Sequence, residues 1–165
     1  FTEWQDLVDL LDAQPGKQVL SSDYRLIKDR DYLLLSHVEA KNNDEDILIS
    51  EEDKAVKTPF GILFFDEANA VLEKTPNIIY VDNDKLKFPL KLRKKEEGDV
   101  FFPLGMNGKK KLSKYFKDEK LSLLDKENTW LLCSENDIVW VVNKRADNRF
   151  KVTENTKNIL KIRLD

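Results

Sequence analysis

The chain has 165 residues, of which 36% are charged and 41% are hydrophobic, and its formal net charge is −3. This composition is typical of a globular domain with a charge-rich surface and excludes a disordered chain. The absence of an apolar run of about 20 residues excludes a membrane-spanning helix, and early acidic residues argue against a secretory signal, so we expect a cytoplasmic protein with no membrane partner.

The first half predicts one helix followed by short strands. Trp4, Leu7, Val8 and Leu11 fall at i, i+3, i+4 and i+7, the spacing of an amphipathic helix. A hairpin is expected over residues 24–36, and further strands at 47–49, 55–57, 62–65 and 78–81. We place a domain boundary after this region, giving a first domain at residues 1–82 and a second at 83–165.

The second half predicts more strands. Apolar residues alternate with polar ones from Leu86 to Arg93, which is typical of a half-buried strand, and Pro89 predicts that this strand lies at a sheet edge or carries a bulge. A hairpin is expected from 130–133 to 138–142, and a closing strand at 159–164. The fold class is therefore α+β, with a β-rich, layered, sandwich-like second domain that carries one or two short helices, after a small helix-plus-strands domain.

Residues 101–116 combine a glycine loop, a basic run and a short helix. Gly105 and Gly108 permit positive φ, Lys109, Lys110 and Lys111 follow, and Leu112, Tyr115 and Phe116 share one helix face. The lysines indicate either a polyanion-binding loop or an ordinary solvated loop. For the aromatic residues of this stretch we favour core packing over stacking on nucleic-acid bases.

Charge is unevenly distributed along the chain. Residues 39–82 hold 11 acidic and 4 basic residues, a net charge of −7, whereas residues 85–120 hold 12 basic and 5 acidic residues, a net charge of +7. A local positive excess of this size indicates a surface for nucleic acid or another polyanion. Alternatively, the two regions attract each other.

Signatures of enzymatic chemistry are missing from the sequence. It contains no GxxxxGK[ST], GxGxxG, CxxC, HExxH or GxSxG motif, and its single Cys133 and single His37 exclude an internal disulfide and a His-rich metal site. The carboxylates at 51–53 and 66–67 are expected at a solvated edge. We therefore expect no catalytic residues, metal site or cofactor within this chain.

A series of short motifs lies between residues 82 and 152. They are Leu86-Lys87-Phe88-Pro89-Leu90-Lys91-Leu92-Arg93, Gly98-Asp99, Pro103-Leu104-Gly105-Met106, Gly108-Lys109-Lys110-Lys111-Leu112-Ser113, Ile138-Val139-Trp140-Val141 and Arg145-Ala146-Asp147. In these motifs the chain resembles the C-terminal domain of the bacterial tRNA(Ile)-lysidine synthetases, and residues 1–37 resemble the domain that precedes it. Two positions depart from the family pattern: Val100 replaces an arginine, and Asn143 lies where a glycine is usual.

The resemblance implies a function for the chain. The family enzyme is an ATP-dependent ligase of tRNA modification that joins lysine to the wobble cytidine of an isoleucine tRNA with a CAU anticodon. Its N-terminal PP-loop domain, which uses ATP and magnesium, carries an SGGxDS motif that this sequence lacks. The chain would then be the non-catalytic, tRNA-binding part of that enzyme, with the enzyme's own ATPase domain as a partner and a homodimer left open. The family's C-terminal domain is similar to a β-rich domain of phenylalanyl-tRNA synthetase.

We predict an RNA-facing surface made of basic side chains. Its residues are Arg93, Lys94, Lys95, Lys109, Lys110, Lys111, Lys114, Arg145 and Arg149. Two alternatives remain: a protein-interaction module that docks an acidic partner through its basic half, and a small enzyme of unknown chemistry.

Overall fold

The computed structural model describes residues 4–38 and 44–165, and the chain divides into two compact units. One unit combines Phe1–Asp44 with Glu119–Asn128, and the other combines Glu45–Asp118 with Thr129–Asp165. None of the helices in the described ranges has the length and apolar character needed to cross a membrane.

The first unit contains the predicted helix and hairpin. Its helix α1 (Trp4–Leu11) precedes an antiparallel sheet of β1 (Gln18–Leu20), β2 (Tyr24–Asp29) and β3 (Tyr32–His37) in that order. Leu10 on the helix and Ile27 on β2 are buried, which gives the unit a small apolar centre. The amphipathic spacing and the turn residues of the hairpin therefore predicted these elements correctly.

A short helix that the sequence reading missed completes this unit. Helix α3 (Leu123–Glu127) begins after Ser122, whose hydroxyl oxygen accepts a hydrogen bond from the Asp125 backbone N–H. Such a side-chain cap satisfies one of the N–H groups left free at a helix start. Glu127 at the end of α3 forms an ion pair with Arg25 on β2, which ties the two sequence segments of the unit together.

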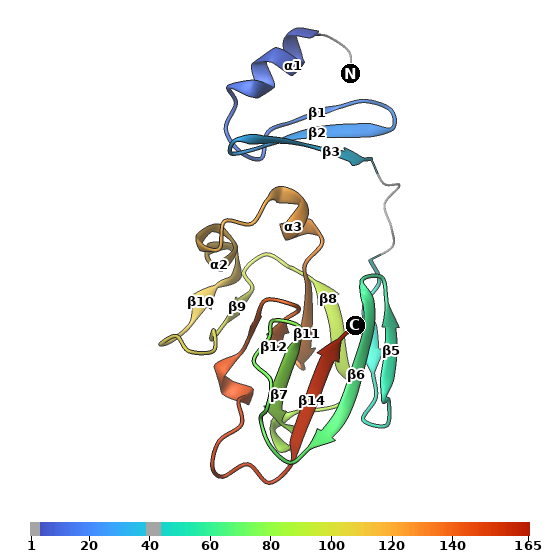
Figure 1. Ribbon diagram of the computed structural model, residues 1–165, viewed down its shortest axis with the longest axis vertical. Helices are drawn as coiled ribbons and strands as arrows, with labels where there is room; N and C mark the ends of the chain where they lie inside the picture. The colour runs from blue at the N-terminus through green and yellow to red at the C-terminus, as the bar shows by residue number, and fades with distance from the viewer. Residues whose placement is uncertain (1–3, 39–43) are drawn as a thin grey trace. The chain divides into compact units, whose positions relative to one another are not determined.

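The second unit is built from two antiparallel sheets (Figure 1). The five-stranded sheet has the order β13 (Arg145–Ala146), β12 (Asp137–Val141), β11 (Trp130–Ser134), β8 (Leu90–Lys94), β4 (Ile47–Ile49). The four-stranded sheet has the order β5 (Ala55–Thr58), β6 (Gly61–Ala68), β14 (Ile159–Leu164), β7 (Ile78–Asp82). Every strand pair in these sheets is antiparallel.

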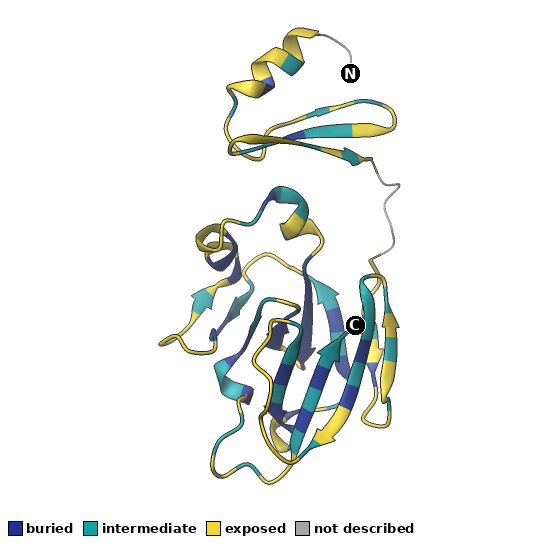
Figure 2. Ribbon diagram, viewed as in Figure 1, coloured by how far each residue is buried: buried dark blue, intermediate teal, exposed yellow. Residues whose placement is uncertain are grey.

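Apolar side chains from both sheets form a single core. The cluster includes Leu92 and Trp140 from the first sheet and Phe65, Val81 and Ile162 from the second. Figure 2 shows β11 buried along its whole length, as expected for a strand in the middle of a covered sheet. Two sheets that share one core constitute a sandwich, which confirms the predicted β-rich, layered fold.

A small two-stranded ladder and a helix complete the second unit. The ladder pairs β9 (Val100–Phe101) with β10 (Lys110–Lys111), and α2 (Leu112–Asp118) follows directly. The rings of Phe101 and Tyr115 meet edge to face with centroids 5.1 Å apart, and Phe116 is also buried. These aromatic side chains therefore pack in the protein interior, as predicted, and are unavailable for stacking on bases. Single 3-10 turns span Asn83–Lys85 and Asn148–Phe150.

The compact units do not follow the predicted boundary between residues 82 and 83. Strand β7 ends at Asp82, yet it pairs with β14, where Asp82 faces Ile159. Residues 45–82 therefore share a sheet and a core with the C-terminal part of the chain. The local polarity around Asp82 marks a turn and not a domain boundary.

The strand predicted over residues 86–93 also differs from the one observed. Strand β8 begins at Leu90, directly after Pro89, and it pairs with β11 on one side and β4 on the other. Proline has no backbone N–H to give to a ladder, so it is found just outside the strand. Because the ladder begins after it, Pro89 does not force β8 to the sheet edge.

Candidate functional site

The basic run lies at the base of a hairpin loop that the rest of the second unit holds in place. β9 leads into the loop and β10 leads out, with Phe101 opposite Lys110 and Val100 opposite Lys111. The Leu104 N–H donates to the Ala146 carbonyl at 2.9 Å, and the Asn148 N–H donates to the Phe102 carbonyl. The first part of the loop is thus fixed to the segment around β13.

Two glycines let this loop turn tightly. Gly105 and Gly108 both have φ of 82°, a left-handed conformation that residues with a Cβ rarely adopt. The Met106 N–H closes the first turn on the Pro103 carbonyl at 3.0 Å. The glycine spacing noted in the sequence therefore has a definite structural purpose.

A surface groove of about 470 Å³ lies beside the loop and the start of α2. Four lysines and one carboxylate line it: Lys109, Lys110, Lys111, Lys114 and Asp118. Lys109, Lys111 and Lys114 are exposed, and within residues 4–38 and 44–165 none of the three forms an ion pair. The structure therefore brings the predicted basic run together as one cationic groove.

Lys110 differs from its neighbours because it is already partnered. Its Nζ atom lies 2.6 Å from Asp118 Oδ2 at the end of α2, and its side chain is 19% exposed. Hydrogen bonding to Lys110 lowers the pKa of Asp118, so this carboxylate stays ionised. The pair closes one side of the groove and leaves the other three lysines to set its charge.

Arg93 is a structural residue and does not belong to an open basic surface. Its guanidinium donates two hydrogen bonds of 2.9 Å to the Asp99 carboxylate, and both side chains are 11% exposed. Burial acts to raise the pKa of Asp99, but hydrogen bonds from Arg93 and from the Glu96 N–H outweigh it and lower that pKa. The pair fixes the turn between β8 and β9, which carries the Gly98-Asp99 motif.

Arg149 is likewise engaged with carboxylates. It donates to the buried Asp147 through Nε and Nη2, each at 3.0 Å, and its Nη1 donates to Asp137 at 3.0 Å. Its guanidinium also lies over the Phe102 ring, 4.4 Å from the centroid. Asp147 in turn accepts the Phe102 N–H, so this cluster secures the entry to the basic loop.

The remaining predicted cations have different surroundings. Lys94 lies over the Trp130 ring at 4.9 Å, whereas Lys95 is exposed in the following turn. Arg145 donates to the Leu104 carbonyl at 3.1 Å and lines a second cavity next to the loop. None of these three residues lines the cationic groove.

The two departures from the family pattern have simple structural consequences. Val100 occupies a strand position opposite Lys111 and offers no charge where the family usually has arginine. Asn143 has φ of 60°, and asparagine tolerates this left-handed conformation better than other residues with a side chain. The turn after β12 can therefore form without the usual glycine.

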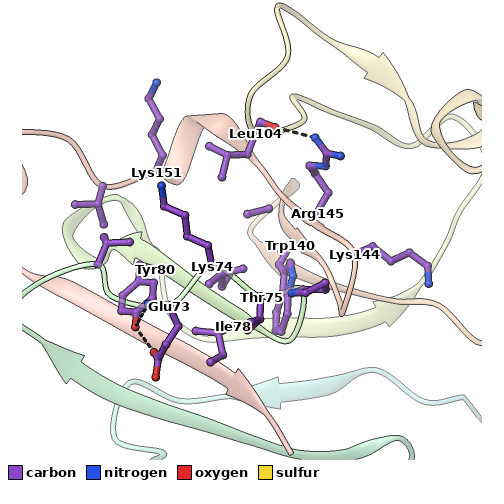
Figure 3. Close-up of a pocket in the computed structure, with 15 residues that line it drawn as sticks. Glu73, Lys74, Thr75, Ile78, Tyr80, Leu104, Trp140, Lys144, Arg145 and Lys151 are labelled. Carbon is purple, nitrogen blue, oxygen red and sulfur yellow. Dashed lines mark hydrogen bonds between the residues drawn. The ribbon is translucent and has the colours of Figure 1, made fainter. Parts of the chain in front are cut away.

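The second cavity contains basic residues that the sequence reading did not single out. Lys74, Lys144 and Lys151 line it from three separate segments (Figure 3). Lys144 and Lys151 lie within ten residues of each other in the sequence, but their proximity to Lys74 arises only from the fold. Within the described part of the chain, no group of three or more His, Cys, Asp or Glu side chains could hold a metal ion.

Two family models match the chain. The TilS substrate binding domain matches residues 1–38, and the TilS substrate C-terminal domain matches residues 90–164. Curated relatives named tRNA(Ile)-lysidine synthase include one from Parabacteroides distasonis, 46% identical over 158 residues, and one from Bacteroides thetaiotaomicron, 36% identical over 159 residues. The match covers 94% of this chain in both cases, and 36% and 34% of the respective relatives. The chain therefore spans about a third of the length of these relatives.

A solved structure is similar in fold to this chain. The structure described as "Crystal structure of TILS C-terminal domain" aligns with a TM-score of 0.59 and 19% sequence identity. The alignment covers 73% of this chain and 98% of that chain. At this level of identity the likeness shows a shared fold alone.

Proposed function

Because the chain belongs to the tRNA(Ile)-lysidine synthase family and corresponds to the C-terminal part of its members, we propose that it is the tRNA-holding part of such an enzyme. The complete enzyme would be an ATP-dependent ligase that attaches lysine to the wobble cytidine of an isoleucine tRNA with a CAU anticodon. The chemistry, with ATP and magnesium, would belong to a cytoplasmic N-terminal ATPase domain that works alongside this chain.

The observation that carries the proposal is the groove, in which three lysines form no ion pair with any of the described residues. Lys109, Lys111 and Lys114 project from a loop and a helix that a two-sheet core supports. Duplex RNA has a deep, narrow major groove, so proteins hold it mainly by its shape and through its phosphates and 2′-hydroxyls. Lysines on a rigid scaffold suit phosphate contacts of this kind, which position the RNA without reading its sequence.

We propose a smaller set of residues for this surface than the sequence alone suggested. Lys109, Lys111 and Lys114 form its centre, and Lys95 is a further exposed cation. Arg93 and Arg149 already satisfy buried or half-buried carboxylates, so RNA would have to compete with those partners. We assign these two arginines to the support of the groove and its loop.

Binding of labelled tRNA to the 165-residue chain tests the proposal. We expect saturable binding at about 50 mM salt, with unlabelled tRNAs of other sequences competing to a similar extent. Polyglutamate at equal charge concentration should compete poorly, because its carboxylates lack the spacing of an A-form backbone. Equal competition by polyglutamate would favour the acidic-protein partner instead, and no tRNA binding at all would contradict the proposal.

A further inference from the structure

A second cavity of about 530 Å³ lies in the sandwich unit, next to the basic loop. Figure 3 shows side chains from the 73–75 segment, from β7 and from the turn between β12 and β13 around it. The volume is within the range of about 300–1,000 Å³ that is typical of small-molecule sites. The cavity is therefore large enough for a ligand of defined shape.

The indole N–H of Trp140 is a hydrogen-bond donor in the lining that a ligand could use. This side chain is fully buried and lines the cavity, yet within the described residues its Nε1–H has no hydrogen-bond acceptor. Buried tryptophan N–H groups usually find a partner, because an unsatisfied donor away from water is costly. An acceptor atom inserted among the lining side chains would satisfy this donor.

Four cationic side chains are among the described residues that line the cavity. Lys74, Lys144 and Lys151 line it, and in the ranges that the structure describes they take part in no ion pair. Arg145 adds a fourth cation, which the Leu104 carbonyl holds in position. These groups would attract a ligand that carries a phosphate.

Among the described residues that line the cavity, Glu73 is the one carboxylate, and it already has a cationic partner. Glu73 accepts hydrogen bonds from Lys161 and Tyr80, and these bonds lower its pKa. Lys161 Nζ lies 2.8 Å from Glu73 Oε2. Glu73 is thus engaged in an ion pair and cannot offset the charge of the lysines.

The rest of the lining is apolar and partly aromatic. Ile78, Ile79 and the ring of Tyr80 come from β7, and the 40% exposed side chain of Leu104 comes from the basic loop. A flat, weakly polar group fits such a wall better than a sugar or a simple ion does. The site therefore combines a place for a planar ring, a donor for a ring acceptor and cations for a phosphate.

We propose that this cavity binds one unpaired nucleotide of an RNA, with an acceptor atom of its base at Trp140 Nε1 and its phosphate near Lys74 and Lys151. Leu104 lines the cavity, while Pro103 and Met106 of the same loop line the cationic groove. A single RNA could thus leave its backbone in the groove and place one unstacked base in the cavity, a common mode of RNA recognition. The inference rests on the proposed RNA-binding function and adds a base-contacting site to it.

The indole N–H signals of the 15N-labelled chain test this proposal directly. Tryptophan occurs at positions 4, 130 and 140, and Trp140→Phe identifies the signal of Trp140 by its loss. Adenosine 5′-monophosphate and cytidine 5′-monophosphate are the probes, with inorganic phosphate and free adenosine as controls. We expect at least one nucleotide to shift the Trp140 signal saturably, the controls to act far more weakly, and the Trp4 signal to stay unchanged.

A matched pair of variants tests the role of the cations. Lys74→Ala with Lys151→Ala should weaken the nucleotide affinity obtained from this shift about tenfold, because two charges that attract the phosphate are removed. Lys54→Ala with Lys57→Ala removes two exposed lysines elsewhere in the same unit and should leave the shift unchanged. Both pairs retain Trp140, so the comparison does not depend on the folding of Trp140→Phe.

The contrary outcomes separate this inference from the function on which it rests. If labelled tRNA binds through the groove lysines but neither nucleotides nor tRNA move the Trp140 signal, the cavity is not a nucleotide site and the tRNA-holding role survives. If inorganic phosphate shifts the signal as strongly as a nucleotide does, the site takes a phosphate alone. If tRNA does not bind the chain at all, the proposed function itself is wrong.

Discussion

Arg93 at the end of β8 and Asp99 in the turn before β9 form two parallel hydrogen bonds of 2.9 Å, and each side chain is 11% exposed. The Asp99 carboxylate also accepts the Glu96 N–H at 2.7 Å. Asp99 contributes its backbone carbonyl to Leu112, the first residue of α2. Asp99 thus links β8 and the turn through its carboxylate, and the helix that borders the cationic groove through its backbone carbonyl.

Asp99→Asn should therefore destabilise the chain in a pH-dependent way. Breaking a buried pair on one side costs about 3 kcal/mol near neutral pH, because Arg93 keeps its charge without its carboxylate partner. The folded-state pKa of Asp99 is lowered, so its stabilisation is complete above the unfolded value near pH 4 and is lost as the pH falls through the folded value. Urea unfolding of parent and variant at pH 7 and pH 3 should show a smaller difference at the lower pH. An equal difference at both pH values would contradict this assignment.

Arg149→Ala should lower the free energy of unfolding of the chain, and not only its affinity for RNA. The substitution removes two donors from the buried Asp147, for an expected loss of about 2 kcal/mol. Arg145→Ala is the matched control, since Arg145 donates a single hydrogen bond to a backbone carbonyl and should cost less. Thermal unfolding measures both variants. A stable Arg149→Ala chain with sharply reduced tRNA affinity would instead make Arg149 an RNA contact.

Gly61→Ala should disturb the junction between β6 and the C-terminus. Gly61 has φ of 141°, and a Cβ there would lie 2.5 Å from the Asp165 carbonyl oxygen. The backbone in this place must shift, for a cost of about 1–3 kcal/mol. Gly98→Ala is the control: it has φ of 84° and open space around its Cβ position, so only the conformational cost remains. If the two variants unfold at the same urea concentration, the close approach of the Asp165 carbonyl oxygen to Gly61 does not add to the loss of stability.

Cys133 should be unreactive in the folded chain. Its side chain is buried in β11, and burial raises the pKa of its thiol to about 11. Because the thiolate is the nucleophile, alkylation at pH 8 should be negligible until the protein unfolds in urea. Labelling followed by mass spectrometry checks this; rapid modification of the folded chain would show that the strand opens.

Local patterns predicted the elements whose partners lie close in sequence. The helix over Trp4–Leu11, the β2–β3 hairpin and the β11–β12 hairpin all follow from periodicity and turn residues. The burial of Phe101 and of the aromatic face of α2 was also predicted correctly. The capping signal Ser122-Leu123-Leu124-Asp125 was present in the sequence, although α3 was overlooked.

Features that depend on distant pairing could not be predicted in this way. The predicted domain boundary after residue 82 was wrong because β14, at the other end of the chain, pairs with β7. The basic residues could be recognised from their type. Whether a basic side chain forms an ion pair, however, depends on acidic residues that the fold brings next to it, such as Asp118 and Asp147. The cavity at Trp140 is formed by residues from three parts of the chain, within 71–80, at Leu104 and within 140–152, so no local motif predicts it.

The salt dependence of tRNA binding tests the central claim most directly. If Lys109, Lys111 and Lys114 neutralise about three phosphates, raising salt from 50 to 200 mM should weaken binding by about 20- to 40-fold. Lys109→Ala with Lys111→Ala should reduce the log–log slope by about 1.5 units and leave thermal unfolding near that of the parent, because exposed lysines bury little. Lys54→Ala with Lys57→Ala, which removes equal charge from β5 and the residue before it, should leave the slope unchanged. A Lys109/Lys111 double variant that keeps both the affinity and the slope of the parent would contradict the tRNA-holding role of the groove.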